Sequence, residues 1–142
     1  MKKSLLTLGF ILVAQAVVAG SVVAIFMNIS SSRKAAALAA TLFLVLGILM
    51  VVLTWKLPQR KFLLTFWNGW VHLLVFTLPM LLMRLVHWNL PFAEIQWWGL
   101  KATTLHNYSL PFYKWMMVAV VIDLLRLIFV SWRLNKTKQV GG

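Results

Sequence analysis

Four long apolar stretches dominate the sequence, and they restrict the fold more than any other feature. They cover residues 5–27, 35–55, 62–86 and 112–132. A helix of about 20 mostly apolar residues crosses the ~30 Å hydrocarbon core of a bilayer, and each stretch reaches that length. Because backbone polar groups in lipid must find partners within the chain, such segments span as helices. The sequence therefore predicts an all-α fold: a polytopic membrane protein whose four transmembrane helices form one domain.

Composition and charge distribution agree with this prediction. Of the 142 residues, 62% are hydrophobic and 11% charged, whereas about a quarter of a soluble domain is charged. A net charge of +12 is compatible with nucleic acid binding, but the lysines and arginines lie at the ends of the apolar stretches, where they set topology and meet lipid headgroups. We therefore expect the lipid bilayer as partner and no nucleic acid. The absence of cysteine excludes disulfides and thiolate metal sites.

The first apolar stretch resembles a signal peptide at its start but is long enough to span. Lys2 and Lys3 precede it, and Val17-Val18-Ala19 offers a cleavage site. Hydrophobicity nevertheless continues to Met27, which predicts an uncleaved first span. Small residues recur every fourth position at Ala16, Gly20 and Ala24, a spacing that either permits close helix packing or reflects the composition of spans.

The third stretch contains a proline in its interior. Pro79 lacks a backbone N–H and should kink this helix.

Positive charges at the ends of the stretches predict the orientation. With the N-terminus inside, the outer flanks hold four basic residues and the inner flanks hold eight. The outer four are Arg33, Lys34, Lys101 and Lys114, and the inner eight are Lys2, Lys3, Lys56, Arg60, Lys61, Arg133, Lys136 and Lys138. The positive-inside rule then places both termini in the cytoplasm.

Residues 87–111 differ in character from the apolar stretches on either side. From Pro91 onward, five apolar side chains fall on one face of a helix; they are Phe92, Ile95, Trp98, Ala102 and Leu105. Tryptophan is typical of the membrane–water boundary, so we expect an outer loop with a short interfacial helix between spans three and four. An ordinary ordered loop is the alternative. Residues 133–142 are predicted to form a basic C-terminal tail.

Four polar residues inside spans three and four are the first candidate site. Asn68, His72, Asp123 and Arg126 fall within apolar surroundings, where an ionised side chain must be paired or hydrated. Counted from Lys61 and Arg133, His72 and Asp123 each lie about 15 Å deep, which predicts that the four meet near mid-membrane. The cluster would either fix helix register through an Asp–Arg pair or handle protons or substrate through a carboxylate–imidazole pair.

A second candidate site lies at the predicted outer face. Met80, Met83 and His87 share one face of span three, and His106 follows in the loop. Thioether and imidazole groups suit Cu(I), although methionine also fills gaps between packed helices. Haem b would require His87 and His106 to pair near the outer surface, because His72 has no histidine partner at its own depth. Copper and haem b are therefore the two cofactors that this group of residues suits.

The function hypotheses follow from what the sequence lacks. It contains no phosphate-binding loop, dinucleotide fingerprint or hydrolase motif, and Glu94 and Asp123 are its only acidic residues. The leading hypothesis is a small non-enzymatic subunit or accessory protein of the cell membrane, in a bacterial inner membrane. It would dock to other membrane subunits or form a homo-oligomer. The alternatives are a small oligomeric transporter or channel that uses the polar cluster, and a haem- or copper-binding electron-transfer or metal-handling subunit.

Overall fold

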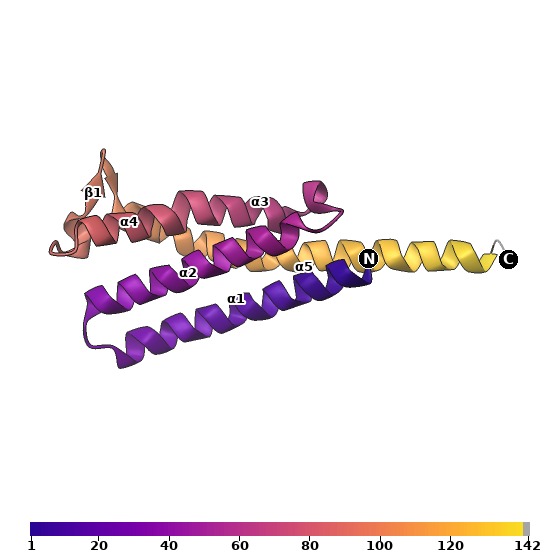
Figure 1. The fold of residues 1–142 in the computed structure, drawn as a ribbon, viewed down its shortest axis with the longest axis horizontal. Helices are drawn as coiled ribbons and strands as arrows, with labels where there is room; N and C mark the ends of the chain where they lie inside the picture. Colours follow the sequence, from indigo (N-terminus) through magenta and orange to yellow (C-terminus); the bar gives the residue numbers. More distant parts are fainter. Residues whose placement is uncertain (141–142) are drawn as a thin grey trace.

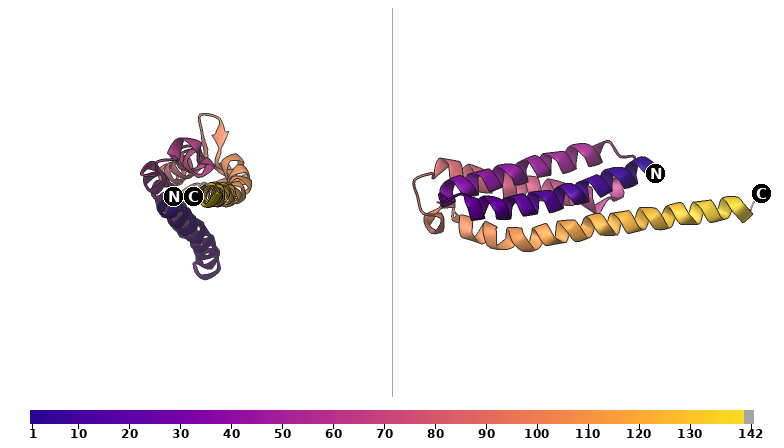
Figure 2. Two further views of the ribbon diagram at one scale, coloured as in Figure 1. Left: turned by 90° about the vertical axis from the view of Figure 1, so that its right-hand side faces the viewer. Right: turned by 90° about the horizontal axis from the view of Figure 1, so that it is seen from below.

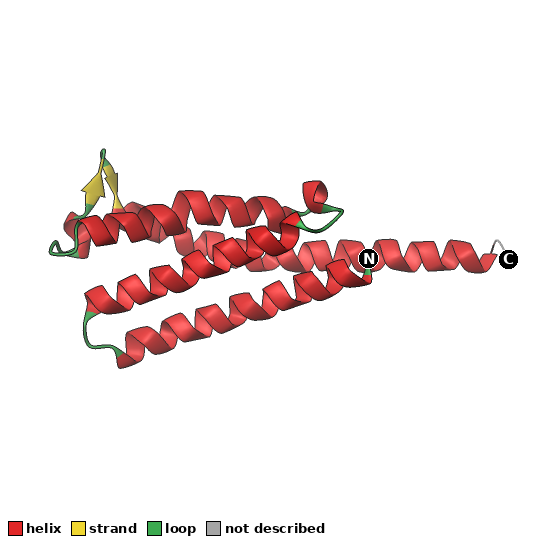
Figure 3. Cartoon of the chain, viewed as in Figure 1, coloured by secondary structure: helices red, strands yellow, loops and turns green. Residues whose placement is uncertain are grey.

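The computed structural model is a bundle of antiparallel helices (Figures 1 and 3). It describes residues 1–140, with side chains up to Thr137. Helix α1 is Lys2–Asn28, α2 is Ser32–Trp55, and α5 is Ala102–Val140. The third helical segment, Leu64–Val86, consists of several shorter helices. Within the described residues, four helices are long and apolar enough to cross a membrane, which confirms the predicted all-α architecture.

The third helical segment is interrupted by a π-helical turn. It consists of α3 (Leu64–Val71), the π-helix η2 (His72–Thr77) and α4 (Leu78–Val86). Pro79 stands in the first turn of α4 and cannot donate a backbone hydrogen bond to the preceding turn. The Thr77 hydroxyl instead donates to the carbonyl oxygens of His72 (3.0 Å) and Leu73 (3.2 Å). We predicted that Pro79 would disturb the regular helix, and the disturbance takes the form of a widened helical turn directly before it.

The connection after α4 is a β-hairpin, and the prediction of an interfacial helix there is wrong. A short 3₁₀ turn, η3 (Phe92–Glu94), leads into the antiparallel strands β1 (Gln96–Trp97) and β2 (Leu100–Lys101). The turn residues Trp98 and Gly99 have φ of 50° and 81°, as a two-residue hairpin turn requires. The expected apolar face is split: its residues Ile95, Ala102 and Leu105 are buried, whereas Phe92 and Trp98 are exposed.

Helix α5 is longer at both ends than the predicted fourth span. It begins at Ala102, continues through Pro111 and extends through the predicted basic tail to Val140. Ala102 and Leu105 pack against Phe76, Met83 and Ile95, so burial against the third helical segment stabilises a start well before residue 112. Beyond the rest of the bundle the helix continues alone (Figures 1 and 2).

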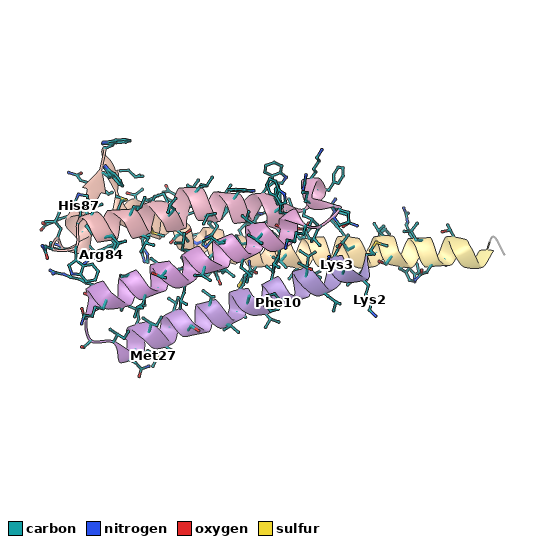
Figure 4. All side chains as sticks on the ribbon, viewed as in Figure 1. Lys2, Lys3, Phe10, Met27, Arg84 and His87 are labelled. Atoms are coloured by element: carbon teal, nitrogen blue, oxygen red, sulfur yellow. The ribbon has the colours of Figure 1, made fainter. Side chains whose placement is uncertain are left out.

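The two ends of the bundle carry different groups. We call the end that holds Lys2, Lys3 and the α2–α3 connection the basic end, and the opposite one the hairpin end. Figure 4 shows Lys2 and Lys3 at the first, and Arg84 and His87 at the second. The largest buried cluster joins α1, α2, α3 and α5; its members are Leu8, Ile11, Leu46, Met50, Leu57, Leu63, Phe66, Tyr113, Met116, Val120 and Leu127.

Helix α1 contributes fully buried side chains to this core only through its first half, whereas Val18 and Ala19 of its second half pack against the core and are partly buried. Its buried residues are Ser4, Leu8, Ile11 and Gln15. From residue 16 to its end no side chain of α1 is buried, and this half diverges from α5 (Figures 1 and 2). The second half of α1 is therefore less deeply packed in the bundle than the first.

Candidate functional site

Asp123 of α5 caps the N-terminus of α3. Its carboxylate, 1% exposed, accepts the backbone N–H of Leu64 at 3.1 Å and that of Thr65 at 2.7 Å. The Thr65 hydroxyl donates to the same carboxylate at 2.7 Å. The first N–H groups of a helix have no partner within it, and the positive end of the helix dipole favours a negative charge. Asp123 thus performs the role of an N-cap residue from another helix.

Arg126 partly balances the charge of Asp123. Its Nη1 lies 3.8 Å from Asp123 Oδ1 and donates to the Phe62 carbonyl at 3.2 Å. The Arg126 side chain is 57% exposed, so the ion pair is open on one side. The predicted contact between Asp123 and Arg126 is present, and it lies at the basic end rather than in the middle of the bundle.

Asn68 lies apart from Asp123 and contacts a different residue of α5. Its Oδ1 accepts the indole N–H of Trp115 at 3.2 Å. This bond crosses between α3 and α5 nearer the hairpin end than the Asp123 cap does. Sequence reasoning missed Trp115 because a tryptophan in an apolar helix gives no sign of its partner.

His72 is buried in an aromatic environment and does not meet Asp123. Its side chain is 3% exposed, and its ring centroid lies 6.0 Å from those of both Phe43 and Tyr113. Neither ring nitrogen makes a hydrogen bond of normal geometry among the described residues, although the ring interacts with the backbone of Phe43. Because His72 stands seven residues after Thr65, it is about 10 Å further along the helix than the Asp123 cap. The predicted meeting of the four residues is therefore wrong, since only Asp123 and Arg126 lie together.

A polar contact on the other side of Tyr113 was not expected from the sequence. The Tyr113 hydroxyl donates to the backbone carbonyl of Gln15, and Gln15 Nε2 lies 3.7 Å from the Met50 sulfur. Gln15 is the one side-chain amide within the first apolar stretch. A polar residue at that position was the sequence feature that could have predicted this contact. Together with His72, these residues form a buried polar centre between α1, α2, η2 and α5.

The residues of the predicted outer-face site lie at the hairpin end in different surroundings. Met83 is buried with Phe76 and Ile95, and Met80 packs against the same cluster. His87 Nδ1 lies 3.1 Å from the Met83 carbonyl oxygen of its own helix. His106 is exposed, with its ring edge-on to Phe92 at 5.7 Å. No group of three histidine or acidic residues in the described chain is placed to hold a metal ion.

The polar groups of these residues are mainly occupied by contacts between helices of this chain. The Asp123 carboxylate is occupied by three donors from α3, and the His72 ring faces Phe43 and Tyr113. Comparison with known proteins adds no constraint: no family model matches the chain, and neither a curated protein nor a solved structure is significantly similar to it.

Proposed function

We propose that this chain is a small non-enzymatic membrane protein that docks through its helices to a larger membrane assembly. Four apolar helices support membrane insertion. The concentration of basic residues at one end supports an orientation with both termini in the cytoplasm, and a bacterial inner membrane is the location we propose. The short connections leave little mass outside the bilayer, so the helix surfaces offer most of the area for contacts.

The second half of α1 is the observation that carries the docking proposal. Ala16, Gly20 and Ala24 are exposed along it, and an added Cβ at Gly20 would meet no atom within 4 Å. Small side chains let another helix approach the backbone closely, and such contacts drive association in membranes. Because α5 diverges from this half of α1 (Figure 2), the face is free for a helix from another chain.

Gly20→Leu tests this proposal with the chain extracted from its native membrane in mild detergent. We expect the wild-type chain to co-purify with membrane partners in fixed proportion, and the variant to lose them while keeping its helicity. Gly9→Leu is the matched control, since Gly9 lies on the same helix and also has open space around it.

Two outcomes overturn the proposal. One is a wild-type chain that purifies alone at native expression. The other is an isolated chain that shows saturable transport or turnover after reconstitution into liposomes.

A small oligomeric transporter is the second candidate, and the buried polar centre favours it. π-Helical turns are frequent at functional sites, and η2 begins at His72, whose ring nitrogens lack partners in the described chain. His72→Phe in reconstituted liposomes separates the two candidates: it should abolish flux in a transporter and leave a docking subunit fully able to assemble.

Haem or copper binding stays a prediction, and an absorption spectrum with metal analysis of the purified protein tests it.

A further inference from the structure

The connection between α2 and α3 forms an open pocket at the basic end. The pocket has a volume of about 590 Å³ and is lined by Trp55, Lys56, Leu57, Pro58, Arg60, Lys61 and Phe62. Three of its seven lining residues are cationic. The two acidic side chains are not among them: Glu94 is in η3 at the hairpin end, and Asp123 is engaged by α3. The pocket therefore presents positive charge with no carboxylate in its walls.

Arg60 is held in place at this pocket. Its Nη1 donates to the Trp55 carbonyl at 3.2 Å, and its guanidinium carbon lies 5.0 Å from the centroid of the Trp55 ring. Only one of several guanidinium N–H donors is used in this bond. The planar group retains donors for a phosphate, whose oxygens match its geometry.

A second, apolar pocket adjoins the first along the helices. It has a volume of about 360 Å³ and is lined by Val51, Val52, Trp55, Lys56 and Trp70. Trp55 and Lys56 belong to both pockets, and the rings of Trp55 and Trp70 lie edge to face at 6.3 Å. Val51, Val52 and Trp70 are further from the bundle end than the basic side chains, so the apolar pocket extends toward the bundle's middle.

We infer that the two pockets together bind one anionic phospholipid, with its phosphate at Lys56, Arg60 and Lys61 and an acyl chain in the apolar pocket. A free phosphate would fill the first pocket but leave the second without a ligand. Basic clusters at the cytoplasmic end of a span attract anionic lipids, and a zwitterionic lipid brings an ammonium group that these three cations repel. The inference rests on the membrane location in the proposed function and is independent of docking to a partner.

Native mass spectrometry of the full purified chain in detergent tests the inference, with phosphatidylglycerol and phosphatidylcholine as probes. We expect phosphatidylglycerol to be retained in preference, one molecule per chain. The combined variant K56Q/R60Q/K61Q should weaken its binding by roughly tenfold to a hundredfold. R33Q/K34Q/K101Q is the matched control, because it removes the same charge from the hairpin end, and it should leave the preference unchanged.

The acyl-chain pocket is tested separately by a pair of substitutions on α2. Val52→Trp fills the apolar pocket, whereas Val45→Trp adds the same bulk two helical turns away on the same face. Both valines are about half exposed, at 47% and 57%, so neither change disturbs the core. We expect weaker lipid binding only with Val52→Trp, and no displacement of the lipid by soluble glycerol phosphate.

Each contrary result overturns a stated part of the inference. If both triple variants lose the same amount of phosphatidylglycerol binding, the lipid is attracted to the net charge of the protein and not to this pocket. Displacement by glycerol phosphate identifies a soluble phosphate compound as the ligand, and no effect of Val52→Trp overturns the placement of an acyl chain in the apolar pocket. No preference for phosphatidylglycerol removes the site altogether. Recovery of the chain outside the membrane fraction instead contradicts the proposed location, and this is measured before any lipid is added.

Discussion

The Asp123 carboxylate accepts both the backbone N–H and the hydroxyl of Thr65, each at 2.7 Å, although the two residues are 58 positions apart. This contact joins α5 to the first turn of α3. A buried carboxylate bound in this way stabilises a helix start that no residue of its own segment caps with a side chain. The contact therefore provides the clearest stability test in the molecule.

Asp123→Ala should destabilise the fold by about 1–3 kcal/mol, because it leaves the N–H groups of Leu64 and Thr65 buried without an acceptor. Thr65→Val should cost about 1 kcal/mol alone and much less when Asp123 is already alanine. Unfolding in mixed detergent measures both changes. Arg126→Gln is the control and should cost below about 1 kcal/mol, since its ion pair is long and exposed. Full additivity of Asp123→Ala and Thr65→Val would contradict the bond from the Thr65 hydroxyl to the Asp123 carboxylate.

His72→Phe should leave the free energy of unfolding unchanged or slightly increased. Both ring nitrogens are buried without partners in the described chain, and an apolar ring of similar shape removes their desolvation cost. His72→Ala should instead cost about 2–4 kcal/mol through the cavity that it leaves. Thermal melting of the two variants measures the difference. A large loss of stability in the phenylalanine variant would reveal a polar partner of His72.

Gly69→Ala should weaken the packing of α2 against α3. An added Cβ at Gly69 would lie 3.3 Å from Met50 Cβ and 3.5 Å from Val51 Cγ2, so we expect a cost of about 1–2 kcal/mol from the crowding. Gly20→Ala serves as the comparison, because its Cβ meets open space and its helix should gain about 0.5–1 kcal/mol. Equilibrium unfolding of the isolated chain measures the change in the free energy of unfolding for both variants. A gain at Gly69 would show that the helices separate easily.

Trp98→Asn should stabilise the hairpin. Trp98 has a φ of 50° and is 97% exposed, a left-handed conformation that asparagine adopts at lower cost than an aromatic residue. Hydrogen exchange of residues 95–102 should slow about threefold to tenfold. Trp97→Asn is the control: it sits in β1, where asparagine is disfavoured, and exchange there should quicken. Faster exchange in both variants would indicate that the Trp98 side chain itself supports the turn.

Apolar length was sufficient to predict the four long apolar helices, because it depends on composition and not on contacts. The place of Asp123 along the bundle differs from the prediction for a physical reason. Its position was counted from Arg133, on the assumption that the first basic residue after the span marks the inner membrane boundary and that α3 reaches the same level. Helix α5 continues past the basic end of the bundle, and the contact between Arg126 and the Phe62 carbonyl shows that Asp123 is close to that end.

The hairpin was missed because its signal is weak in the sequence. A two-residue turn with positive φ normally carries asparagine or aspartate before glycine, and here tryptophan occupies that position. The apolar spacing from Phe92 to Leu105 fits a helix, yet only three of its five residues are buried. The cap at Thr65 and the bond from Trp115 to Asn68 depend on how α3 and α5 are aligned, which periodicity within one helix does not encode.

Because α5 is one continuous helix, the position of its C-terminal part is fixed relative to the bundle. From Asp123, which is tied to α3, to Val140 the helix rises about 25 Å. Because this helix is continuous and Asp123 is tied to α3, Arg133 and Lys136 lie at a fixed distance and in a fixed direction from the rest of the bundle. A partner that binds these two side chains and tilts the helix would transmit that tilt to the contact between Asp123 and the first turn of α3.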